Sequence, residues 1–258
     1  MNISAGDVSV EIEAGVAVVT IDRPEVRNAI GFATIDELDA ALERVLESSP
    51  AVLVLRGGGD RAFVSGGDLK ELNAVRTFED AVRMASRMRQ VLDRVAAFPV
   101  PVVAALNGHA LGGGAEVAIA ADIRVAADDV KIGFNQVTLG IMPAWGGAER
   151  LAQAIGRSRA LLAIATGELY DAPTAQRLGL VDIVVPRAVF DHEWRKLARR
   201  MAAAAPGTTR AVKSVVSAAA PSFHRELEAS AVAEFAQLWT ADAHWAAVEA
   251  LEQKRRTA

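Results

Sequence analysis

The residues with the clearest chemical potential lie in the stretch NGHALGGGAE, residues 107–116, where three consecutive glycines separate two apolar segments. Glycine loses more backbone entropy on folding than any other residue and adds no side chain to a core, so this run is costly. Apolar residues 100–106 predict a buried strand before it, and Ala-rich residues 116–121 predict a helix after it. A helix N-terminus offers unpaired N–H donors and partial positive charge. The stretch therefore predicts a site for an anion or an oxyanion.

A second junction of the same kind lies upstream, in AFVSGGDLKEL, residues 62–72. An apolar run again meets paired glycines, Gly66 and Gly67, and then the start of a helix. Two such junctions predict two backbone N–H donors that converge on one oxygen. Tight turns are the alternative for either glycine run. Nucleotide sites fit poorly, because the glycines at 112–114 are followed by no Gly-Lys-Ser/Thr and form no Gly-x-Gly-x-x-Gly.

Glu116 follows the three glycines in the first turn of the predicted helix. The helix dipole alone stabilises a carboxylate there by roughly 0.3–1 kcal/mol, so the position leaves a structural and a catalytic role open. Asp68 and Asp122 are expected to cap helices or to accept backbone hydrogen bonds. For His109, the histidine near the glycines, we expect a structural role.

The composition argues against several other kinds of site. The chain has 258 residues, 52% of them hydrophobic, which is enough for a sizeable core. A net charge of −4 with only short basic clusters argues against nucleic acid as a partner. Cysteine is absent and the four histidines are far apart, so disulfides and metal sites are not expected. Because no signal segment and no apolar run of about 20 residues is found, we expect a cytoplasmic protein without a membrane partner.

Strands and helices alternate along most of the chain, which predicts an α/β core. Residues 8–12 and 16–21 predict an antiparallel strand pair, and Thr34 is expected to cap the helix that follows. Residues 131–145 predict an irregular segment. Further strands are expected at 51–55, 100–106, 123–126 and 181–185, and further helices at 77–97, 147–155, 159–165 and 172–178.

From Phe190 onward the pattern is helical, with breaks expected at Pro206-Gly207 and at Pro221. Several apolar positions in this region exceed what a lone helical tail can bury. They are Leu227, Ala231, Phe235, Leu238, Trp239 and Trp245. A subunit contact is the simplest explanation.

Segments in a fixed order resemble the crotonase, or enoyl-CoA hydratase/isomerase, superfamily over nearly the full length. They are RPEVRNA at 23–29, FVSGGDLK at 63–70, NGHALGGGAE at 107–116 and PAWGGAERL at 143–151. The resemblance implies a crotonase-like spiral of ββα units over residues 1–189, followed by a helical C-terminal oligomerisation region over residues 190–258. It also implies a homotrimer, often paired into a hexamer.

The same resemblance implies an acyl-CoA thioester substrate, held with its carbonyl oxygen between two backbone N–H groups. By motif position these groups belong to Gly67 and Gly113, which agrees with the two glycine junctions. Arg27, and Lys254 or Arg255, are implied contacts for the CoA phosphates, with solvated surface charge as the alternative. Coenzyme A enters as part of the substrate, so no separate cofactor is expected.

Hydratases of this superfamily use two glutamates, and the first matches Glu116, which implies a catalytic role. The second closes a Phe-x-x-Pro-Glu motif that falls on residues 132–136, where this chain has Ile-Gly-Phe-Asn-Gln. Gln136 therefore takes the place of the second glutamate. A glutamine cannot gain or lose a proton near neutral pH, but it can orient water or hydrogen-bond a substrate.

The resemblance leaves more than one function open. We expect a hydratase-type lyase that uses Glu116 with Gln136 assisting. The stretch GIMPAWGG at 140–147 is similar to ethylmalonyl-CoA decarboxylase-like members, which favours decarboxylation of a short 2-alkylmalonyl-CoA as an alternative. Trp145 would then narrow the acyl pocket, although a core role fits it equally well. A non-catalytic acyl-CoA-binding homologue is a second alternative.

Overall fold

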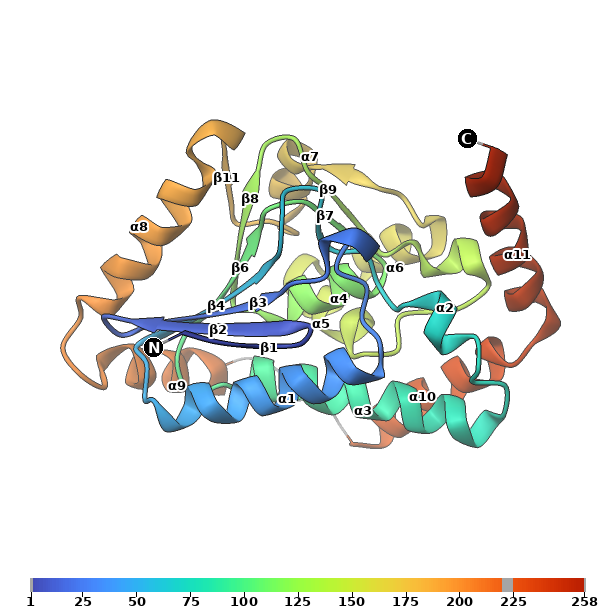
Figure 1. Cartoon of the computed structure of the whole chain (residues 1–258), viewed down its shortest axis with the longest axis horizontal. Helices are drawn as coiled ribbons and strands as arrows, with labels where there is room; N and C mark the ends of the chain where they lie inside the picture. Colours follow the sequence, from blue (N-terminus) through green and yellow to red (C-terminus); the bar gives the residue numbers. More distant parts are fainter. Residues whose placement is uncertain (1, 220–224, 258) are drawn as a thin grey trace.

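The computed structural model describes residues 2–219 and 225–257, and its larger sheet has seven strands (Figure 1). The strand order is β1-β2-β3-β4-β6-β8-β11. The strands are β1 (Asn2–Ala5), β2 (Val8–Glu13), β3 (Val16–Ile21), β4 (Val52–Gly57), β6 (Val102–Leu106), β8 (Ile123–Ala127) and β11 (Ile183–Val185). β2 and β3 form the predicted antiparallel pair, and every pair from β3 to β11 is parallel.

A smaller sheet has the strand order β10-β9-β7-β5. Its strands are β5 (Ala62–Val64), β7 (His109–Leu111), β9 (Lys131–Gly133) and β10 (Tyr170–Asp171). β5, β7 and β9 are parallel neighbours, while β10 pairs antiparallel with β9. The carboxyl ends of β5, β7 and β9 therefore meet at one edge of this sheet.

The two sheets are linked by a repeating ββα connection. β4, β6 and β8 lie in the larger sheet, and each is followed by a strand of the smaller sheet, β5, β7 or β9. Each strand of the smaller sheet then leads into helical structure. This repetition confirms the predicted spiral of ββα units.

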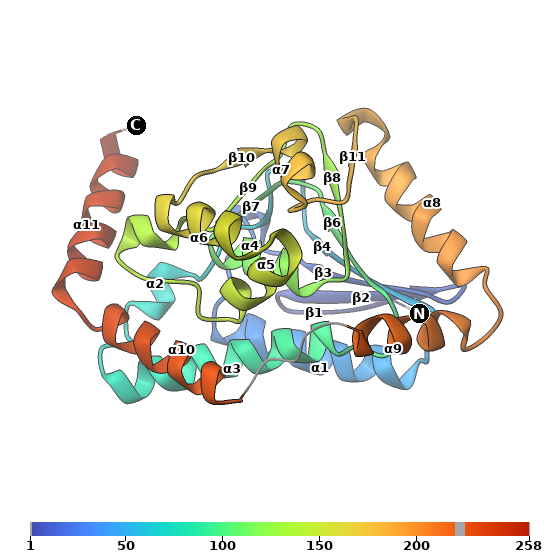
Figure 2. The same ribbon diagram turned by 180° about the vertical axis from the view of Figure 1, so that it is seen from behind.

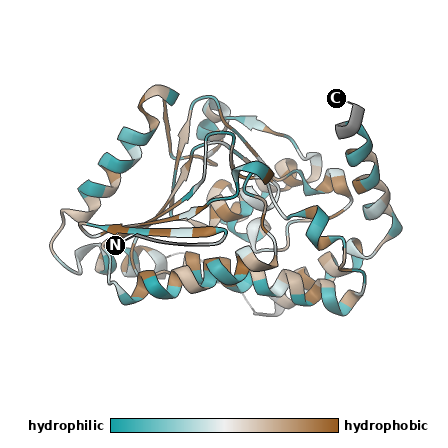
Figure 3. Ribbon diagram, viewed as in Figure 1, coloured by the Kyte–Doolittle hydropathy of each residue, from teal (hydrophilic) through white to brown (hydrophobic). Residues whose placement is uncertain are grey.

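Helices cover both faces of the larger sheet (Figures 1 and 2). α1 packs on β2 and β3, and α3 packs against α1. α8 lies on the other side of the sheet, where it packs on β3, β4 and β8. In Figure 3 the strands are largely brown and α8 is largely teal, as expected for a buried sheet and a solvent-facing helix. The helices are α1 (Phe32–Glu47), α2 (Leu69–Leu72), α3 (Phe78–Ala96), α4 (Gly113–Ala120), α5 (Gly147–Ile155), α6 (Arg157–Thr166), α7 (Ala172–Leu178), α8 (Phe190–Ala202), α9 (Thr208–Ala218), α10 (Arg225–Trp239) and α11 (Asp242–Thr257), with short 3-10 helices η1 (Pro24–Val26), η2 (Asn135–Leu139) and η3 (Arg187–Val189).

The predicted start of the first helix was wrong by a few residues. Helix α1 begins at Phe32 with Gly31 as its N-cap, so Thr34 lies inside the first turn. The Thr34 hydroxyl accepts a hydrogen bond from the Gly31 N–H at 3.3 Å. Thr34 therefore contributes the returning half of a capping box instead of the N-cap itself.

The prediction of an irregular segment at residues 131–145 was wrong for residues 131–139 and is confirmed for residues 140–145. Strand β9 and the 3-10 helix η2 lie within it. β9 forms because β7 and β10 supply backbone partners on both sides. These partners are distant in sequence, so a three-residue strand left no local signal.

The prediction that the C-terminal apolar residues form a subunit contact was wrong for some of them. Phe235 and Trp239 are buried within this chain, where α10 packs against α3. The indole N–H of Trp239 donates to the carbonyl oxygen of Val75 at 3.0 Å. These apolar residues therefore require no second subunit, whereas Leu238 remains 40% exposed.

The remaining predictions for this region have different outcomes. The break at Pro206-Gly207 is confirmed, because α8 ends at Ala202 and α9 begins at Thr208. Pro221 and the side chain of Leu227 lie outside the described residues. The division between residues 189 and 190 coincides with the start of α8 and stays a prediction, as does the trimer or hexamer.

Candidate active site

The two predicted glycine junctions lie next to each other in space. β5 and β7 are parallel neighbours, so the turns that follow them leave the same edge of the smaller sheet. Gly66 and Gly112 make these turns with φ angles of +107° and +56°, which side chains rarely tolerate. A Cβ atom on Gly66 would lie 3.5 Å from the nitrogen of Gly113, so the junctions are in direct contact.

Gly67 and Gly113 both line the same cavity. That their N–H groups are the oxyanion donors stays a prediction. Among the hydrogen bonds of residues 2–219 and 225–257, neither group donates to a protein acceptor. On both sides of Gly67 the backbone is fixed by Ile30, whose N–H donates to Gly66 and whose carbonyl accepts from Asp68, each at 2.9 Å. The two donors are therefore held in place and unsatisfied.

Glu116 is a buried carboxylate, 2% exposed, on the first turn of α4. Its Oε2 accepts hydrogen bonds from the backbone N–H groups of Trp145, at 2.7 Å, and Gly147, at 2.9 Å. Its Oε1 accepts one from the side-chain amide of Gln136 at 2.9 Å. The structure thus brings together the two predicted catalytic residues, with one carboxylate oxygen fixed by backbone and the other facing an amide.

Burial raises the pKa of Glu116 to about 7. The backbone hydrogen bonds from Gly147 and Trp145 lower this pKa, the nearby carboxylate of Glu149 raises it, and the guanidinium of Arg150 lowers it. A carboxyl group with a pKa near neutrality exists in both protonation states at physiological pH. It can therefore take up and release a proton during a reaction.

Gln136 lies on η2 and is 7% exposed. Its Nε2 donates to Glu116, whereas its buried Oε1 has no hydrogen-bond partner in the described part of the chain. A buried acceptor without a partner costs roughly 1–3 kcal/mol. Because Gln136 lines the cavity, a molecule bound there can supply the missing donor.

The indole ring of Trp145 lies against both glycine junctions. A Cβ atom on Gly113 would be 2.2 Å from the ring, and one on Gly67 would be 4.0 Å from it. The ring lines the cavity and is 7% exposed. Trp145 is therefore both buried and part of the cavity wall. Its position is consistent with a core role and with a role in shaping the acyl pocket.

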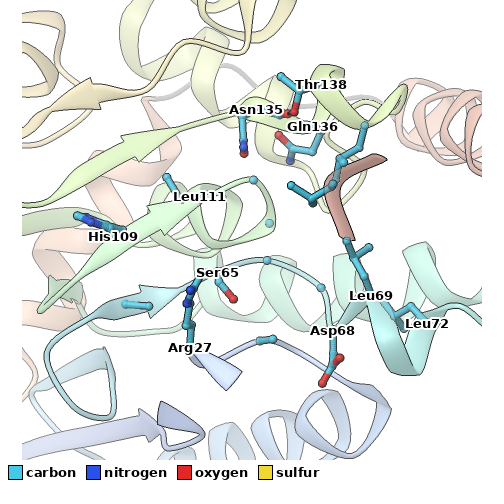
Figure 4. A pocket seen from close by; sticks show the side chains of 18 of the residues that line it. Arg27, Ser65, Asp68, Leu69, Leu72, His109, Leu111, Asn135, Gln136 and Thr138 are labelled. Atoms are coloured by element: carbon cyan, nitrogen blue, oxygen red, sulfur yellow. The ribbon is translucent and has the colours of Figure 1, made fainter. Parts of the chain in front are cut away.

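The cavity has a volume of about 1560 Å³ and extends from these groups to α11. In Figure 4, Asn135 and Gln136 project from one wall, and Arg27 and Ser65 from the opposite wall. Arg27 and Lys254 both line the cavity with exposed side chains, at the two positions predicted to contact CoA phosphates. The side chain of Arg255 lies outside the described residues.

His109, Asp68 and Asp122 make the structural contacts expected of them. The Nδ1 of His109 accepts from the backbone N–H of Lys131 at 3.0 Å, and burial lowers the pKa of this imidazole. Asp68 caps α2 by accepting from the Lys70 N–H at 3.3 Å. Asp122 accepts from the Val102 N–H at 2.7 Å.

The described residues contain neither a metal-binding cluster nor a membrane-spanning helix. Within the described ranges, no group of three or more His, Asp or Glu side chains is arranged to hold a metal ion. Likewise, none of the helices described here combines the length and apolar character needed to cross a bilayer.

The sequence did not predict the backbone donors that hold Glu116. They belong to the start of α5, where Gly146 and Gly147 follow an apolar stretch. This is a third junction of the kind recognised at Gly67 and Gly113. Its N–H groups bind a carboxylate of the chain itself, and the Gly-Gly pair was the available signal. A side chain on Gly147 would lie 2.4 Å from Glu116 Cγ, so glycine is required there.

Comparison with known proteins places this chain in a family. A profile of the enoyl-CoA hydratase/isomerase family matches residues 11–253. The chain belongs to this family. It is 38% identical over 221 residues to the Enoyl-CoA isomerase/hydratase fer4 of Mycosarcoma maydis, covering 82% of this chain and 80% of that protein. It is 34% identical over 211 residues to the Short-chain-enoyl-CoA hydratase of Clostridium acetobutylicum, covering 81% and 80%.

Solved structures of similar proteins agree with the fold. An enoyl-CoA hydratase from Bacillus anthracis has a TM-score of 0.80 at 32% identity, covering 96% of both chains. An enoyl-CoA hydratase from Mycobacterium avium subsp. paratuberculosis has a TM-score of 0.85 at 24% identity, covering 95% of this chain and 98% of that one, which shows the fold alone. The predicted crotonase fold and an enzyme of the enoyl-CoA hydratase type are thereby confirmed. The decarboxylase resemblance gains no support from these comparisons.

Proposed function

We propose that the protein adds water across the α,β double bond of an enoyl-CoA thioester, in a reversible lyase reaction. The observation that supports this best is the Glu116 carboxyl group. It is buried, has a pKa near 7, and lies beside Gln136 in the cavity that the Gly67 and Gly113 N–H groups also line. Relatives named as enoyl-CoA hydratases support the same reaction class.

The thioester oxygen accepts hydrogen bonds from the Gly67 and Gly113 N–H groups in this proposal. Negative charge grows on that oxygen as the thioester becomes enolate-like. Fixed donors stabilise this charge without reorganising, and each such donor is worth about 2.7–4 kcal/mol where measured in other enzymes. Glu116 and Trp145 are 2% and 7% exposed, so charges at this end of the cavity interact more strongly than they would in bulk water.

Glu116 moves the proton. Its carboxylate takes a proton from the attacking water while the water oxygen bonds to the β-carbon. The resulting acid then gives a proton to the α-carbon, which returns Glu116 to the carboxylate and completes the addition of H and OH. The unpartnered Oε1 of Gln136 accepts a hydrogen bond from the other hydrogen of the water, which fixes its orientation.

Several finer expectations belong to this proposal. Arg27 and Lys254 contact the CoA phosphates, which is consistent with their position on the cavity wall. Coenzyme A is then the part of the substrate by which the protein binds it, and the reaction needs no other cofactor. The working assembly is a homotrimer or a hexamer in the cytoplasm.

Hydration of crotonyl-CoA tests the proposal, with the matched variants Glu116→Gln and Glu71→Gln. Glu71 is an exposed carboxylate on the helix that follows Gly67. We expect kcat to fall about 1000-fold for Glu116→Gln, because general acid–base catalysis typically contributes 10²–10⁴-fold. Glu71→Gln is expected to retain wild-type kcat. Wild-type kcat in Glu116→Gln would remove Glu116 from the mechanism.

Decarboxylation of a short 2-alkylmalonyl-CoA is a second candidate, and the neutral Gln136 favours it. A second carboxylate about 4 Å from the carboxylate of such a substrate would repel it by about 4 kcal/mol at an effective dielectric constant near 20. Gln136 avoids this repulsion. The same oxyanion donors would then stabilise the enolate left after carbon dioxide departs.

Gln136→Glu separates the two candidates. For a hydratase, the variant keeps or gains crotonyl-CoA hydration, and neither protein releases carbon dioxide from methylmalonyl-CoA. For a decarboxylase, the wild type releases carbon dioxide and the variant loses that activity. Absence of acyl-CoA binding in calorimetry would contradict both candidates.

A further inference from the structure

A chain of four charged side chains, all but Asp93 largely buried, lies behind the turn that holds Glu116. Arg89 and Asp93 lie on α3, and Glu149 and Arg150 lie on the first turn of α5. Arg89 pairs with Glu149 at 2.8 Å and approaches Asp93 at 3.9 Å, while Arg150 pairs with Asp93. The side chains of Arg89, Glu149 and Arg150 are between 6% and 10% exposed. Desolvating such groups is costly, so an ion pair here is weak evidence for a purely stabilising role.

Arg150 also contacts the turn itself. Its Nη1 donates to the carbonyl oxygen of Trp145 at 2.8 Å. Gly146, in the middle of the turn, has a φ angle of +84°, and a Cβ atom there would lie 2.3 Å from this nitrogen. The guanidinium is therefore packed directly on the Trp145–Gly147 turn. An arginine in the first turn of a helix opposes the helix dipole, so its position needs a specific partner.

The opposite side of this turn faces the reaction centre. The N–H groups of Trp145 and Gly147 bind Glu116 Oε2, and the Trp145 ring packs on Gly113. One peptide segment thus fixes both the orientation of the carboxylate and the wall behind an oxyanion donor. The Arg150 guanidinium is the side-chain group that holds this segment from behind.

We propose that Arg150 is a positioning residue of the active site, which orients Glu116 by holding the Trp145–Gly147 turn. The inference rests on the proposed function of Glu116. Arg150 does not line the cavity, so it acts through the turn and not on the substrate. The charge of Arg150 also lowers the pKa of Glu116, which gives the contact a second, electrostatic consequence.

The main variant is Arg150→Met, which keeps most of the side-chain length and removes the charge and the donors. We expect kcat to fall about 100-fold, the loss typical of a displacement of about 1 Å. KM is expected to change less than about 3-fold, because no substrate contact is removed. The Glu116 pKa should rise, because the nearby cation is lost.

Two further variants distinguish a positioning role of Arg150 from a role in only joining α5 to α3. Arg150→Lys restores the charge without the planar fork, so we expect the Glu116 pKa to return towards the wild-type value and kcat to recover about 10-fold relative to Arg150→Met. Asp93→Ala removes the link from Arg150 to α3 but leaves the Trp145 contact. It should keep kcat within about 3-fold. If Arg150→Met does not fold, Arg150→Lys is compared with the wild type in the same measurements.

The decisive readout is the titration of Glu116 by NMR of carboxyl-labelled glutamate, with the signal assigned by its absence in Glu116→Gln. This readout needs no turnover, so it remains informative if the wild type fails to hydrate crotonyl-CoA and the proposed function is wrong. A higher Glu116 pKa in Arg150→Met, restored in Arg150→Lys, supports the proposal. An unchanged titration in Arg150→Met, or an equal loss of kcat in Asp93→Ala, overturns it.

Discussion

The junctions at Gly67 and Gly113 begin alike but continue differently. Each follows a strand of the smaller sheet, turns at a glycine with positive φ, and presents an unsatisfied N–H to the cavity. After Gly67 the chain forms α2, a four-residue helix with exposed residues and a side-chain cap from Asp68. After Gly113 it forms α4, an eight-residue helix that is almost entirely buried and has Gly112 as its N-cap.

This difference shows how one local pattern supports two roles. In the proposed function the Gly67 junction supplies only a donor, so its helix can be short and solvated. The Gly113 junction would supply a donor and also Glu116 as the proton carrier, and the pKa of Glu116 depends on burial. Burying a carboxylate is costly unless it is hydrogen-bonded, and Glu116 receives three hydrogen bonds, two from the third junction at Gly147 and one from Gln136.

The largest expected effect concerns the cost of that buried carboxylate. Between pH 4.5 and about 7 the folded protein keeps a proton on Glu116 that the unfolded chain has released. The free energy of unfolding of the wild type therefore falls as pH rises through this window, by about 3 kcal/mol. Glu116→Gln lacks this loss, so its stability relative to the wild type should increase by about 3 kcal/mol from pH 4.5 to pH 8.

Urea unfolding at a series of pH values measures this difference directly. Glu71→Gln is the control for removing a carboxylate outside the cavity; Glu71 is exposed beside the Gly67 junction and accepts a hydrogen bond from the Phe32 N–H at 2.8 Å. A relative stability of Glu116→Gln that does not change with pH would show that Glu116 is ionised in the folded protein throughout the range.

The second prediction compares the two oxyanion donors. Gly113→Ala places a Cβ atom 2.2 Å from the Trp145 ring, so the ring and its turn must shift. Gly67→Ala places a Cβ atom 2.8 Å from the flexible end of Leu72, whereas its distance from the Trp145 ring, 4.0 Å, is an ordinary contact. We expect kcat to fall about 100-fold for Gly113→Ala and less than 10-fold for Gly67→Ala, in steady-state assays with crotonyl-CoA. Equal losses would contradict the asymmetry between the junctions.

The smallest expected effect concerns the cap that only the Gly67 junction carries. Asp68 caps α2 and pairs with Arg23 at 3.2 Å. Asp68→Ala should reduce the free energy of unfolding by about 1 kcal/mol, the usual cost of losing an N-cap. Thermal unfolding gives the stability change, and kcat is expected to stay within about 3-fold of the wild type. A large loss of kcat would mean that the position of the Gly67 donor depends on the α2 cap, which would contradict the role given to this junction.

The glycine junctions could be predicted because their signal is local. Paired glycines between an apolar run and a helix start indicate the same backbone geometry wherever they occur, and both junctions were found in this way. The assignment of Gly67 and Gly113 as the donors came from the family resemblance and stays a prediction. The wrong helix start at Thr34 has a local cause too, because Gly31 and Thr34 both satisfy capping rules and only the backbone conformation decides between them.

Other features depend on partners that are distant in sequence. Phe235 and Trp239 are buried by α3, more than 130 residues upstream, so periodicity alone could not distinguish an internal contact from a subunit contact. The link from Asp93 through Arg150 to the Trp145–Gly147 turn likewise joins α3 to α5. For Arg150 one local sign existed, since a cation in the first turn of a helix is unfavourable without a partner.

The pH dependence of kcat/KM for crotonyl-CoA hydration by the wild type tests the central claim most directly. Because Glu116 acts first as a base, activity requires its carboxylate form. The account predicts that kcat/KM rises with pH and levels off above an apparent pKa near 7, the value to which burial raises Glu116. A profile that is already level at pH 5 would show that Glu116 is ionised well below neutrality, and would contradict the proposed role of its burial.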